Sequence, residues 1–144
     1  MNLSASRDIH RPAAEVFEFF ANASNNPRWQ NGMVSCEWTT PPPIAVGSTY
    51  EQHAKFMGRD IRSVFWVTEF DPGTLIAIET IESTFPIQVR RSVSSTGPAT
   101  CQVNAEITGG PGGLMKLLEP LMERFAQRSV DADYDQLKTL LESE

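Results

Sequence analysis

A change of hydrophobic period in the last third of the chain constrains its fold most. From Gly47 to about Thr108, apolar and polar residues alternate between turn signals, whereas from Leu114 to Leu141 the apolar residues recur every three or four positions. Alternation is typical of half-buried strands, and the longer period is typical of an amphipathic helix. The pattern therefore predicts an antiparallel meander of five strands followed by one long C-terminal helix.

The segment before this meander predicts two more strands and two short helices. Residues 2–9 alternate in the manner of a half-buried strand. Pro12 is suited to the first position of a helix that extends to about Ala21, because its fixed φ matches the helical value. A second short helix is expected to carry Trp29, and the alternation over residues 34–38 predicts the second strand.

The turns of the meander determine which side chains share a face, because residues opposite one another in an antiparallel pair point the same way. One assumption about each turn gives the following expected pairs: Phe56 with Ile61, Val67 with Ile78, Ile78 with Ile87, and Arg91 with Val103. These pairs predict a mostly apolar inner face and a mostly polar outer face. Val64 and Trp66 fall on the outer face, where we expect them to form a patch for self-association into a homodimer. If the turn register there differs by one residue, Trp66 instead lines the inner face.

Composition favours one globular domain over residues 1–144. The net charge of −6 has the wrong sign for a protein that binds nucleic acid. No apolar run reaches the roughly 18 residues of a membrane helix, and residues 1–4 do not resemble a signal peptide, so we expect a cytoplasmic protein without a membrane span. Cys36 and Cys101 lack metal-site spacing, and we expect neither a metal nor a cofactor.

The sequence contains no motif of a familiar catalytic centre. His10 lies at a predicted strand-to-helix junction and His53 lies on the predicted outer face, so we expect neither to be catalytic. The glycine-rich segment 109–113 lacks the lysine and hydroxyl side chains of a phosphate-binding loop. We expect that segment to be a hinge or the start of the last helix.

Several segments carry a family resemblance, namely Ile9–Phe17, Asn26–Trp29, Gly47–Tyr50, Val67–Pro72 and Gly112–Leu141. These segments and the order of elements resemble the START and birch-pollen-allergen superfamily (SRPBCC proteins), in its polyketide cyclase/dehydrase branch. The resemblance implies an α+β helix-grip fold, with two short helices after strand 1 and a seven-stranded curved antiparallel sheet wrapped around a long C-terminal helix. It also implies the sheet order 2-1-7-6-5-4-3, and with it free thiols at Cys36 and Cys101.

The resemblance further implies a cavity between the sheet and the C-terminal helix. The predicted inner face is apolar with a few polar groups, which is typical of a small-molecule pocket. The middle of the helix has fewer large apolar residues, which either leaves room for a ligand or marks a solvent-exposed bend. We expect the ligand-binding residues to be Trp29, Tyr50, Gln52, Phe56, Phe65, Ile78, Ile87, Arg91, Ser129 and Asp133.

Arg91 needs a partner, because a guanidinium on the inner face of a sheet loses its hydration. We expect that partner to be Asp133 or Asp135 of the helix, or an acidic group of a ligand. The remaining polar residues of the inner face are otherwise interpreted as hydrogen-bonded core residues. Trp29 is interpreted either as the roof of the pocket, by the resemblance, or as an ordinary core tryptophan.

Three functions follow from these expectations. The first is the binding of a hydrophobic or amphipathic small molecule, such as a lipid, a polyketide or an aromatic compound. The second is an enzyme similar to the polyketide cyclases and aromatases, in which a tyrosine or arginine polarises a carbonyl group. The third is a protein-interaction module that uses the outer sheet face around Trp66.

Overall fold

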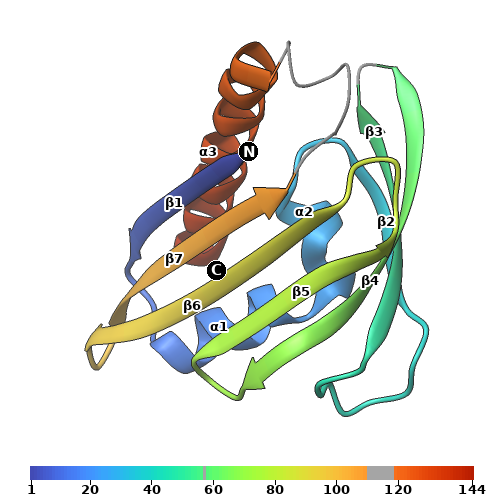
Figure 1. Cartoon of the computed structure of the whole chain (residues 1–144). Coiled ribbons are helices and arrows are strands. Elements are labelled where there is room, and N and C mark those ends of the chain that lie inside the picture. The colour runs from blue at the N-terminus through green and yellow to red at the C-terminus, as the bar shows by residue number, and fades with distance from the viewer. Residues whose placement is uncertain (57, 110–118) are drawn as a thin grey trace.

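A computed structural model describes residues 1–56, 58–109 and 119–144, and in these ranges one curved antiparallel sheet of seven strands packs against the helices (Figure 1). The elements are β1 (Asn2–Ile9), α1 (Ala13–Ala21), the 3-10 helix η1 (Ala23–Asn25), α2 (Asn26–Trp29), β2 (Met33–Trp38), β3 (Thr49–Phe56), β4 (Arg59–Asp71), β5 (Leu75–Glu82), β6 (Ile87–Gly97), β7 (Thr100–Gly109) and α3 (Glu119–Ser143). The predicted α+β helix-grip architecture is confirmed. Residues 110–118, which include most of the glycine-rich segment and the predicted first turn of the last helix, lie outside the described residues.

The sheet order is β1-β7-β6-β5-β4-β3-β2, which corrects the expected position of β2. We expected β2 beside β1, but it pairs with β3, with Cys36 opposite Gln52 and Trp38 opposite Tyr50. Strands consecutive in sequence usually neighbour one another, and the free edge of β1 is covered by α3. The prediction that one strand separates the two cysteine-bearing strands is therefore wrong, although both thiols are free, as expected, and both are buried.

The registers differ from the expected ones by two residues at three of the four turns. Ile61 lies opposite Ala54, Ile78 opposite Val89, and Arg91 opposite Ala105, whereas the expected pair of Val67 with Ile78 is confirmed. Because strand side chains alternate with a period of two, a shift of two keeps every residue on its expected face. The inner and outer faces of the sheet are therefore as predicted.

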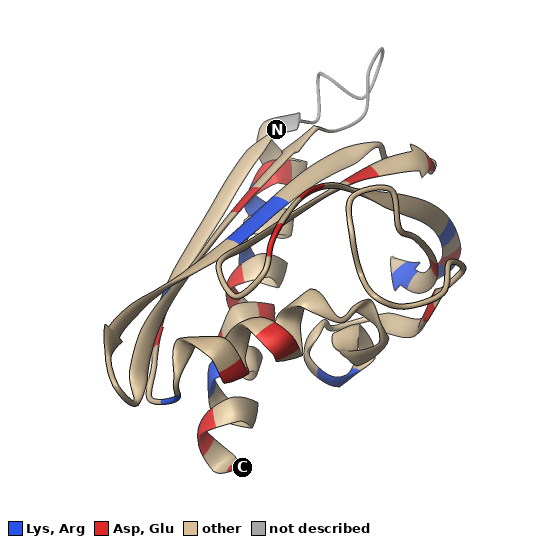
Figure 2. Cartoon of the chain, turned by 90° about the horizontal axis from the view of Figure 1, so that it is seen from below, with Lys and Arg blue, Asp and Glu red and all other residues tan. Residues whose placement is uncertain are grey.

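The helices lie on the concave side of the sheet (Figure 2). Helix α1 buries Val16, Phe17 and Phe20, the apolar stripe that its 3.6 period predicts. Helix α3 buries Tyr134 and Leu137 in its second half. Each such side chain contributes about 1.5–3 kcal/mol when fully buried, so the core is anchored at the α1 end of the molecule. No helix among the described residues is long and apolar enough to cross a membrane.

Side chains at every fourth position of α3 bind the edge of β1. Gln127 accepts a hydrogen bond from the Ser4 backbone N–H and donates one to the Ser4 carbonyl oxygen, at 3.4 and 2.9 Å. Asp131 and Asp135 bind the Arg7 guanidinium at 3.4 and 2.7 Å. Residues four apart share one helix face, so this row aligns α3 along β1. The first turns of α3 consequently lie beside the N-terminal end of β1.

Candidate functional site

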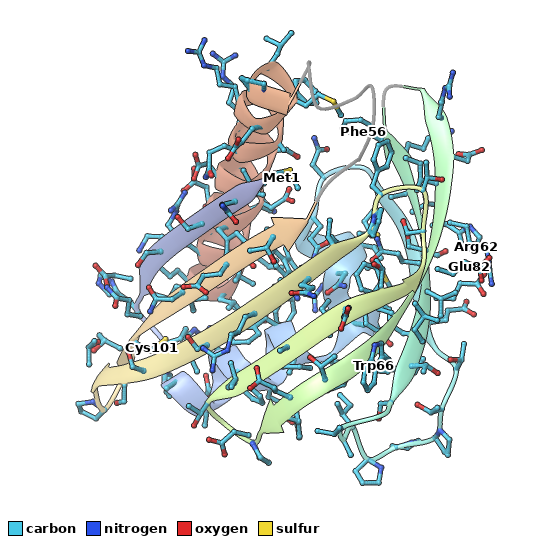
Figure 3. The ribbon with its side chains drawn as sticks, in the orientation of Figure 1. Met1, Phe56, Arg62, Trp66, Glu82 and Cys101 are labelled. Atoms are coloured by element: carbon cyan, nitrogen blue, oxygen red, sulfur yellow. The ribbon has the colours of Figure 1, made fainter. Side chains whose placement is uncertain are left out.

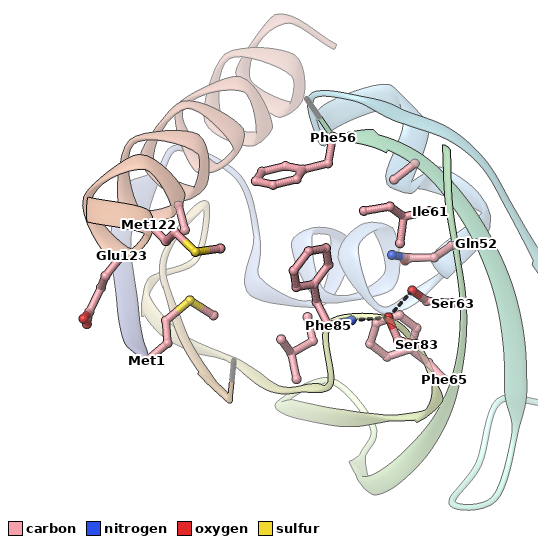
Figure 4. A pocket seen from close by; sticks show the side chains of 13 residues that line it. Met1, Gln52, Phe56, Ile61, Ser63, Phe65, Ser83, Phe85, Met122 and Glu123 are labelled. Carbon is pink, nitrogen blue, oxygen red and sulfur yellow. Dashed lines mark hydrogen bonds between the residues drawn. The ribbon is translucent and has the colours of Figure 1, made fainter. Parts of the chain in front are cut away.

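A cavity of about 230 Å³ lies between the concave sheet face and the first turns of α3 (Figure 4). Thirteen residues line it: Met1, Gln52, Ala54, Phe56, Ile61, Ser63, Phe65, Ser83, Phe85, Ile87, Met122, Glu123 and Ala126. A cavity of roughly 150 Å³ in another protein holds a benzene molecule. The cavity is therefore large enough for a guest of one or two rings.

Strand and helix periods explain why these residues meet. Gln52, Ala54 and Phe56 alternate on β3, and Ile61, Ser63 and Phe65 alternate on β4 beside them. On the opposite wall, Met122 and Ala126 are four residues apart on one face of α3. The small side chains of Ala54 and Ala126, set among large apolar neighbours, leave part of the space between sheet and helix open.

Aromatic rings and thioethers surround the end of the cavity near the chain start. The Phe56 ring lies 5.9 Å from the rings of both Phe85 and Phe125. Figure 4 shows Met1 and Met122 pointing inward from the side of α3. Phe125 is 55% exposed, so apolar surface continues from the cavity onto the outside of the helix.

Two serine hydroxyls form the main polar feature of the lining. Ser63 Oγ and Ser83 Oγ are 2.7 Å apart, and the Phe85 backbone N–H donates to Ser83 Oγ at 3.1 Å. Ser63 is 3% exposed. The amide of Gln52 also extends to the cavity near these hydroxyls (Figure 4). These groups lie within walls that are otherwise apolar.

A stacked pair of rings forms the wall behind the cavity. Phe65 lines the cavity, and Tyr50 stacks on Phe65 with centroids 5.2 Å apart and an interplanar angle of 10°. Behind Tyr50 lies a void of about 10 Å³, lined among others by Asn26, Ile78 and Arg91. The predicted pocket is therefore divided, with open space on one side of the ring pair and close packing on the other.

Arg91 lies in the packed part and has aromatic partners. Its Nε donates to Tyr134 Oη at 2.7 Å, and its guanidinium lies 5.2 Å from the centroid of the Trp29 ring. Burial by itself lowers the pKa of Arg91, but Tyr134, Tyr50 and Asp133 together raise it above its ordinary value, so the residue stays cationic. Burial in turn raises the pKa of the Tyr134 hydroxyl.

The expected ion pair of Arg91 with Asp133 or Asp135 does not occur. Asp135 binds Arg7 on the edge of β1, and Asp133 accepts a hydrogen bond from the Asn31 backbone N–H at 2.8 Å. Burial raises the pKa of Asp133 to about 6, although the Asn31 N–H and the charge of Arg91 both lower it. The Tyr134 hydroxyl is closer to Arg91 because the helix turns residue 134 toward the core and residues 133 and 135 away from it.

Nine of the ten predicted ligand-binding residues fall into three places. Gln52, Phe56, Phe65 and Ile87 line the cavity. Trp29, Tyr50, Ile78 and Arg91 pack behind it. In the middle of α3, where either room for a ligand or a solvent-exposed bend was expected, Tyr134 packs against Trp29 at a centroid distance of 5.1 Å. Asp133 lies on an open surface groove beside α2, and Ser129 lines none of these spaces.

Several lining residues were missed at the level of sequence. Met122 belongs to the apolar stripe of the helix, which is the signal that could have identified it. Ala126 lies one turn further along that face, but a small residue in a stripe gives no sign that space is left beside it. Ser83 lay in a predicted turn, and its contact with Ser63 depends on the length of the loop between β5 and β6.

The outer face of β3 and β4 carries a charged network. Glu51 binds both His53, at 2.8 Å, and Arg62, at 2.9 Å, while Arg62 also reaches Glu82 at 3.3 Å (Figure 3). Hydrogen bonds from Arg62 and His53 lower the pKa of Glu51. Neither this histidine nor the exposed His10 lines the cavity. Within the described ranges, no three histidine, cysteine or acidic residues cluster in the manner of a metal site.

Solved structures share the fold over nearly the whole chain. TTHA0849 from Thermus thermophilus matches with a TM-score of 0.82 at 17% identity, over 96% of this chain and 95% of that chain. The Zhui aromatase/cyclase from a Streptomyces species matches with a TM-score of 0.79 at 12% identity, over 96% and 92%. A START superfamily protein from Mycobacterium smegmatis matches with a TM-score of 0.69 at 14% identity, over 94% and 98%. These likenesses show that the chain shares the helix-grip fold of these structures.

A comparison of the sequence with protein families identifies the family of this chain. Residues 1–142 match the family described as polyketide cyclase / dehydrase and lipid transport, and the chain belongs to that family. No curated protein matches the sequence.

Proposed function

We propose that this protein binds a small hydrophobic or amphipathic molecule in the cavity between the sheet and α3. The observation that supports this most is the cavity of about 230 Å³, with apolar walls and a few polar groups on one side. Apolar walls provide affinity through burial of the ligand surface, and a few hydrogen-bonding groups orient it. The family description, which includes lipid transport, is in keeping with this function.

A cyclase or aromatase function is the second candidate, because structural neighbours include proteins named as aromatase/cyclases. General acid and base catalysis needs titratable groups close to the reacting atoms. Among the described lining residues, Glu123 is the one titratable side chain, and its carboxylate turns outward to the backbone N–H of Asn2 at 3.3 Å. Binding is therefore the function that the geometry favours. Product formation from poly-β-ketone mimics would support the enzyme instead.

The binding function is tested by filling the cavity from α3. Ala126→Phe places a ring in the cavity, whereas Ala132→Phe makes the same change on an exposed position of the same helix. The wild type and both variants are purified without detergent, and the retained small molecules are identified by native mass spectrometry. We expect the wild type and Ala132→Phe to retain a ligand and Ala126→Phe to lose it.

Two results would contradict the proposal. One is a wild-type protein that carries no molecule and binds no one-ring or two-ring compound at millimolar concentration. The other is loss of the ligand in Ala132→Phe but not in Ala126→Phe. The latter result would place the ligand in the groove beside α2, which Ala132 and Asp133 line.

The outer sheet face gives a separate proposal of self-association. Trp66 and Val64 alternate with the cavity residues Ser63 and Phe65, so they point to the outer face. We propose a homodimer through this face. Sedimentation velocity of Trp66→Ala and the wild type tests it, and a monomeric wild type at high concentration would contradict it.

The free thiols at Cys36 and Cys101 support a reducing compartment, and we propose a cytoplasmic location.

A further inference from the structure

We propose that the cavity selects uncharged ligands whose polar end hydrogen-bonds the Ser63–Ser83 hydroxyl pair and the amide of Gln52. This inference rests on the proposed binding function and specifies the chemistry of the ligand. The apolar body would lie between the Phe56 and Phe65 side of the sheet and α3. The polar end would be a neutral hydroxyl, carbonyl or amide group, not a carboxylate.

Counting hydrogen atoms shows that the serine pair has one donor to spare. Each hydroxyl has a single hydrogen, and one of the two is used in the 2.7 Å contact between Ser63 and Ser83. Ser83 Oγ also accepts from the Phe85 N–H, which uses an acceptor site but no hydroxyl hydrogen. Whichever serine donates to the other, the second hydroxyl hydrogen has no acceptor among the described residues. It is available to an acceptor on a ligand.

Gln52 supplies complementary groups beside this pair. It lies opposite Ser63 in the β3–β4 register, and its side-chain amide forms no hydrogen bond with any described residue. An amide offers both an acceptor oxygen and two donor hydrogens. A hydroxyl, carbonyl or carboxamide group on the ligand can therefore form hydrogen bonds with both the serine pair and the Gln52 amide. These bonds are needed because a polar group without a hydrogen-bond partner is unfavourable in an apolar cavity.

The charges of the residues that line the cavity favour neutral ligands over anionic ones. None of the thirteen described lining residues is a lysine or arginine, and the one charged side chain is the acidic Glu123. The buried cation Arg91 lies behind the stacked rings of Tyr50 and Phe65, with its Nε bonded to Tyr134. A carboxylate moved between the walls near Ser63 and Gln52 would lose its hydration without gaining a lysine or arginine partner among the described lining residues.

Four two-ring probes of similar shape test the inference by isothermal titration calorimetry: 2-methylnaphthalene, 2-naphthol, 2-naphthamide and 2-naphthoate. We expect 2-naphthol to bind about fivefold more tightly than 2-methylnaphthalene, the effect of one net hydrogen bond. We expect 2-naphthamide to bind at least about tenfold more tightly than 2-naphthoate, which has a similar shape but carries a charge.

Substitutions at the polar lining residues test whether these residues cause the preference for neutral polar ligands. The double variant Ser63→Ala/Ser83→Ala removes both hydroxyl hydrogens, because the serine that remains in either single variant would still have one hydrogen to donate. It should lower the affinity for 2-naphthol about fivefold and change that for 2-methylnaphthalene less than twofold. Ser94→Ala, on an exposed position of β6, is the matched control and should change neither. Gln52→Leu gives a second, independent test and should reduce the affinity for 2-naphthamide selectively.

The outcomes distinguish this inference from the function on which it rests. Equal binding of 2-naphthol and 2-methylnaphthalene, or binding of 2-naphthoate as tight as that of 2-naphthamide, overturns the selection of neutral polar ligands while the binding function stands. Failure of all four probes to bind overturns both. A loss in the double serine variant that is equal for 2-naphthol and 2-methylnaphthalene assigns a structural role to the serine pair and also contradicts the inference.

Discussion

Tyr50 and Phe65 stack face to face across β3 and β4, with ring centroids 5.2 Å apart, and this pair separates the open cavity from the packed cluster around Arg91. Phe65 touches the open side, and Tyr50 touches the void of about 10 Å³ behind it. Both rings are about 2% exposed. The pair therefore acts as a wall that decides which of the inward residues a ligand can reach.

Removal of the Phe65 ring from this wall should destabilise the fold. Phe65→Ala is expected to lower the free energy of unfolding by about 3–5 kcal/mol, because it enlarges the cavity and removes the stacking on Tyr50. Urea denaturation measures the change. Phe125→Ala, which removes the same ring from a site that is 55% exposed, should change stability by about 1 kcal/mol or less. A loss below about 1 kcal/mol in Phe65→Ala would show that the wall does not stabilise the fold in this way.

The Arg91 cluster should support stability and not ligand binding. Tyr134→Phe removes the hydroxyl that accepts from Arg91 Nε and should lower the free energy of unfolding by about 1.5–3 kcal/mol, as expected for a buried hydrogen bond to a charged group. The affinity for 2-naphthol should stay within twofold of wild type. A large drop in affinity with unchanged stability would instead place Arg91 or Tyr134 in contact with the ligand.

Asp133 should make stability depend on pH. Its pKa is raised from 3.8 to about 6 in the folded protein, so folding favours the protonated form. The stabilisation is complete below pH 3.8 and is lost as the pH rises through about 6. Asp133→Asn keeps an oxygen acceptor for the Asn31 N–H but cannot ionise. At a pH of about 7.5 this variant should be more stable than wild type by about 1–2 kcal/mol, after allowance for solvent screening.

The advantage of Asp133→Asn should shrink as the pH falls toward about 4, which urea denaturation at several pH values would reveal. Asp135→Asn is the matched control on the same helix, since it only removes the exposed ion pair with Arg7. It should lower stability by about 1 kcal/mol or less. An Asp133→Asn variant that is no more stable than wild type above neutral pH would disagree with the burial of this carboxyl.

Gln127 should protect the edge of β1. Gln127→Leu removes the partner of both backbone groups of Ser4, so amide hydrogen exchange at Ser4 should accelerate, and the free energy of unfolding should fall by about 1 kcal/mol. Gln136→Leu, at an exposed position of α3, is the control. Unchanged exchange at Ser4 in Gln127→Leu would mean that the helix does not hold this strand edge.

Most of the fold could be predicted from the sequence because strands and helices differ in the period of their hydrophobic residues. The change from a period of two to one of 3.6 marked the strands and the helix, and errors of two residues at three turns left Gln52, Phe65 and Arg91 on the predicted face. The position of β2 was wrong, since its alternation does not specify a neighbour. That choice depends on α3 covering the edge of β1, a contact between distant parts of the chain.

The candidate site was predictable only in part. Facing inward is a property of strand alternation, and Gln52, Phe56, Phe65 and Ile87 could be found from it. Whether an inward residue lines open space or packed core depends on how side chains fill the interior. Tyr134 and Trp29 fill the space beside Arg91, while Ala126 leaves space about two turns away on the same helix. No local sequence pattern specifies how the side chains distribute their volume in the interior.

The most direct test of a ligand cavity under the first turns of α3 is the location of a bound probe by NMR. Intermolecular nuclear Overhauser effects are recorded between the ring protons of 2-naphthol and the alanine methyl groups of the protein. We predict contacts to the methyl groups of Ala54 and Ala126, which line the cavity, and none to Ala132 on the surface of the same helix. Contacts to Ala132 without contacts to Ala54 or Ala126 would contradict the assignment of this cavity as the binding site.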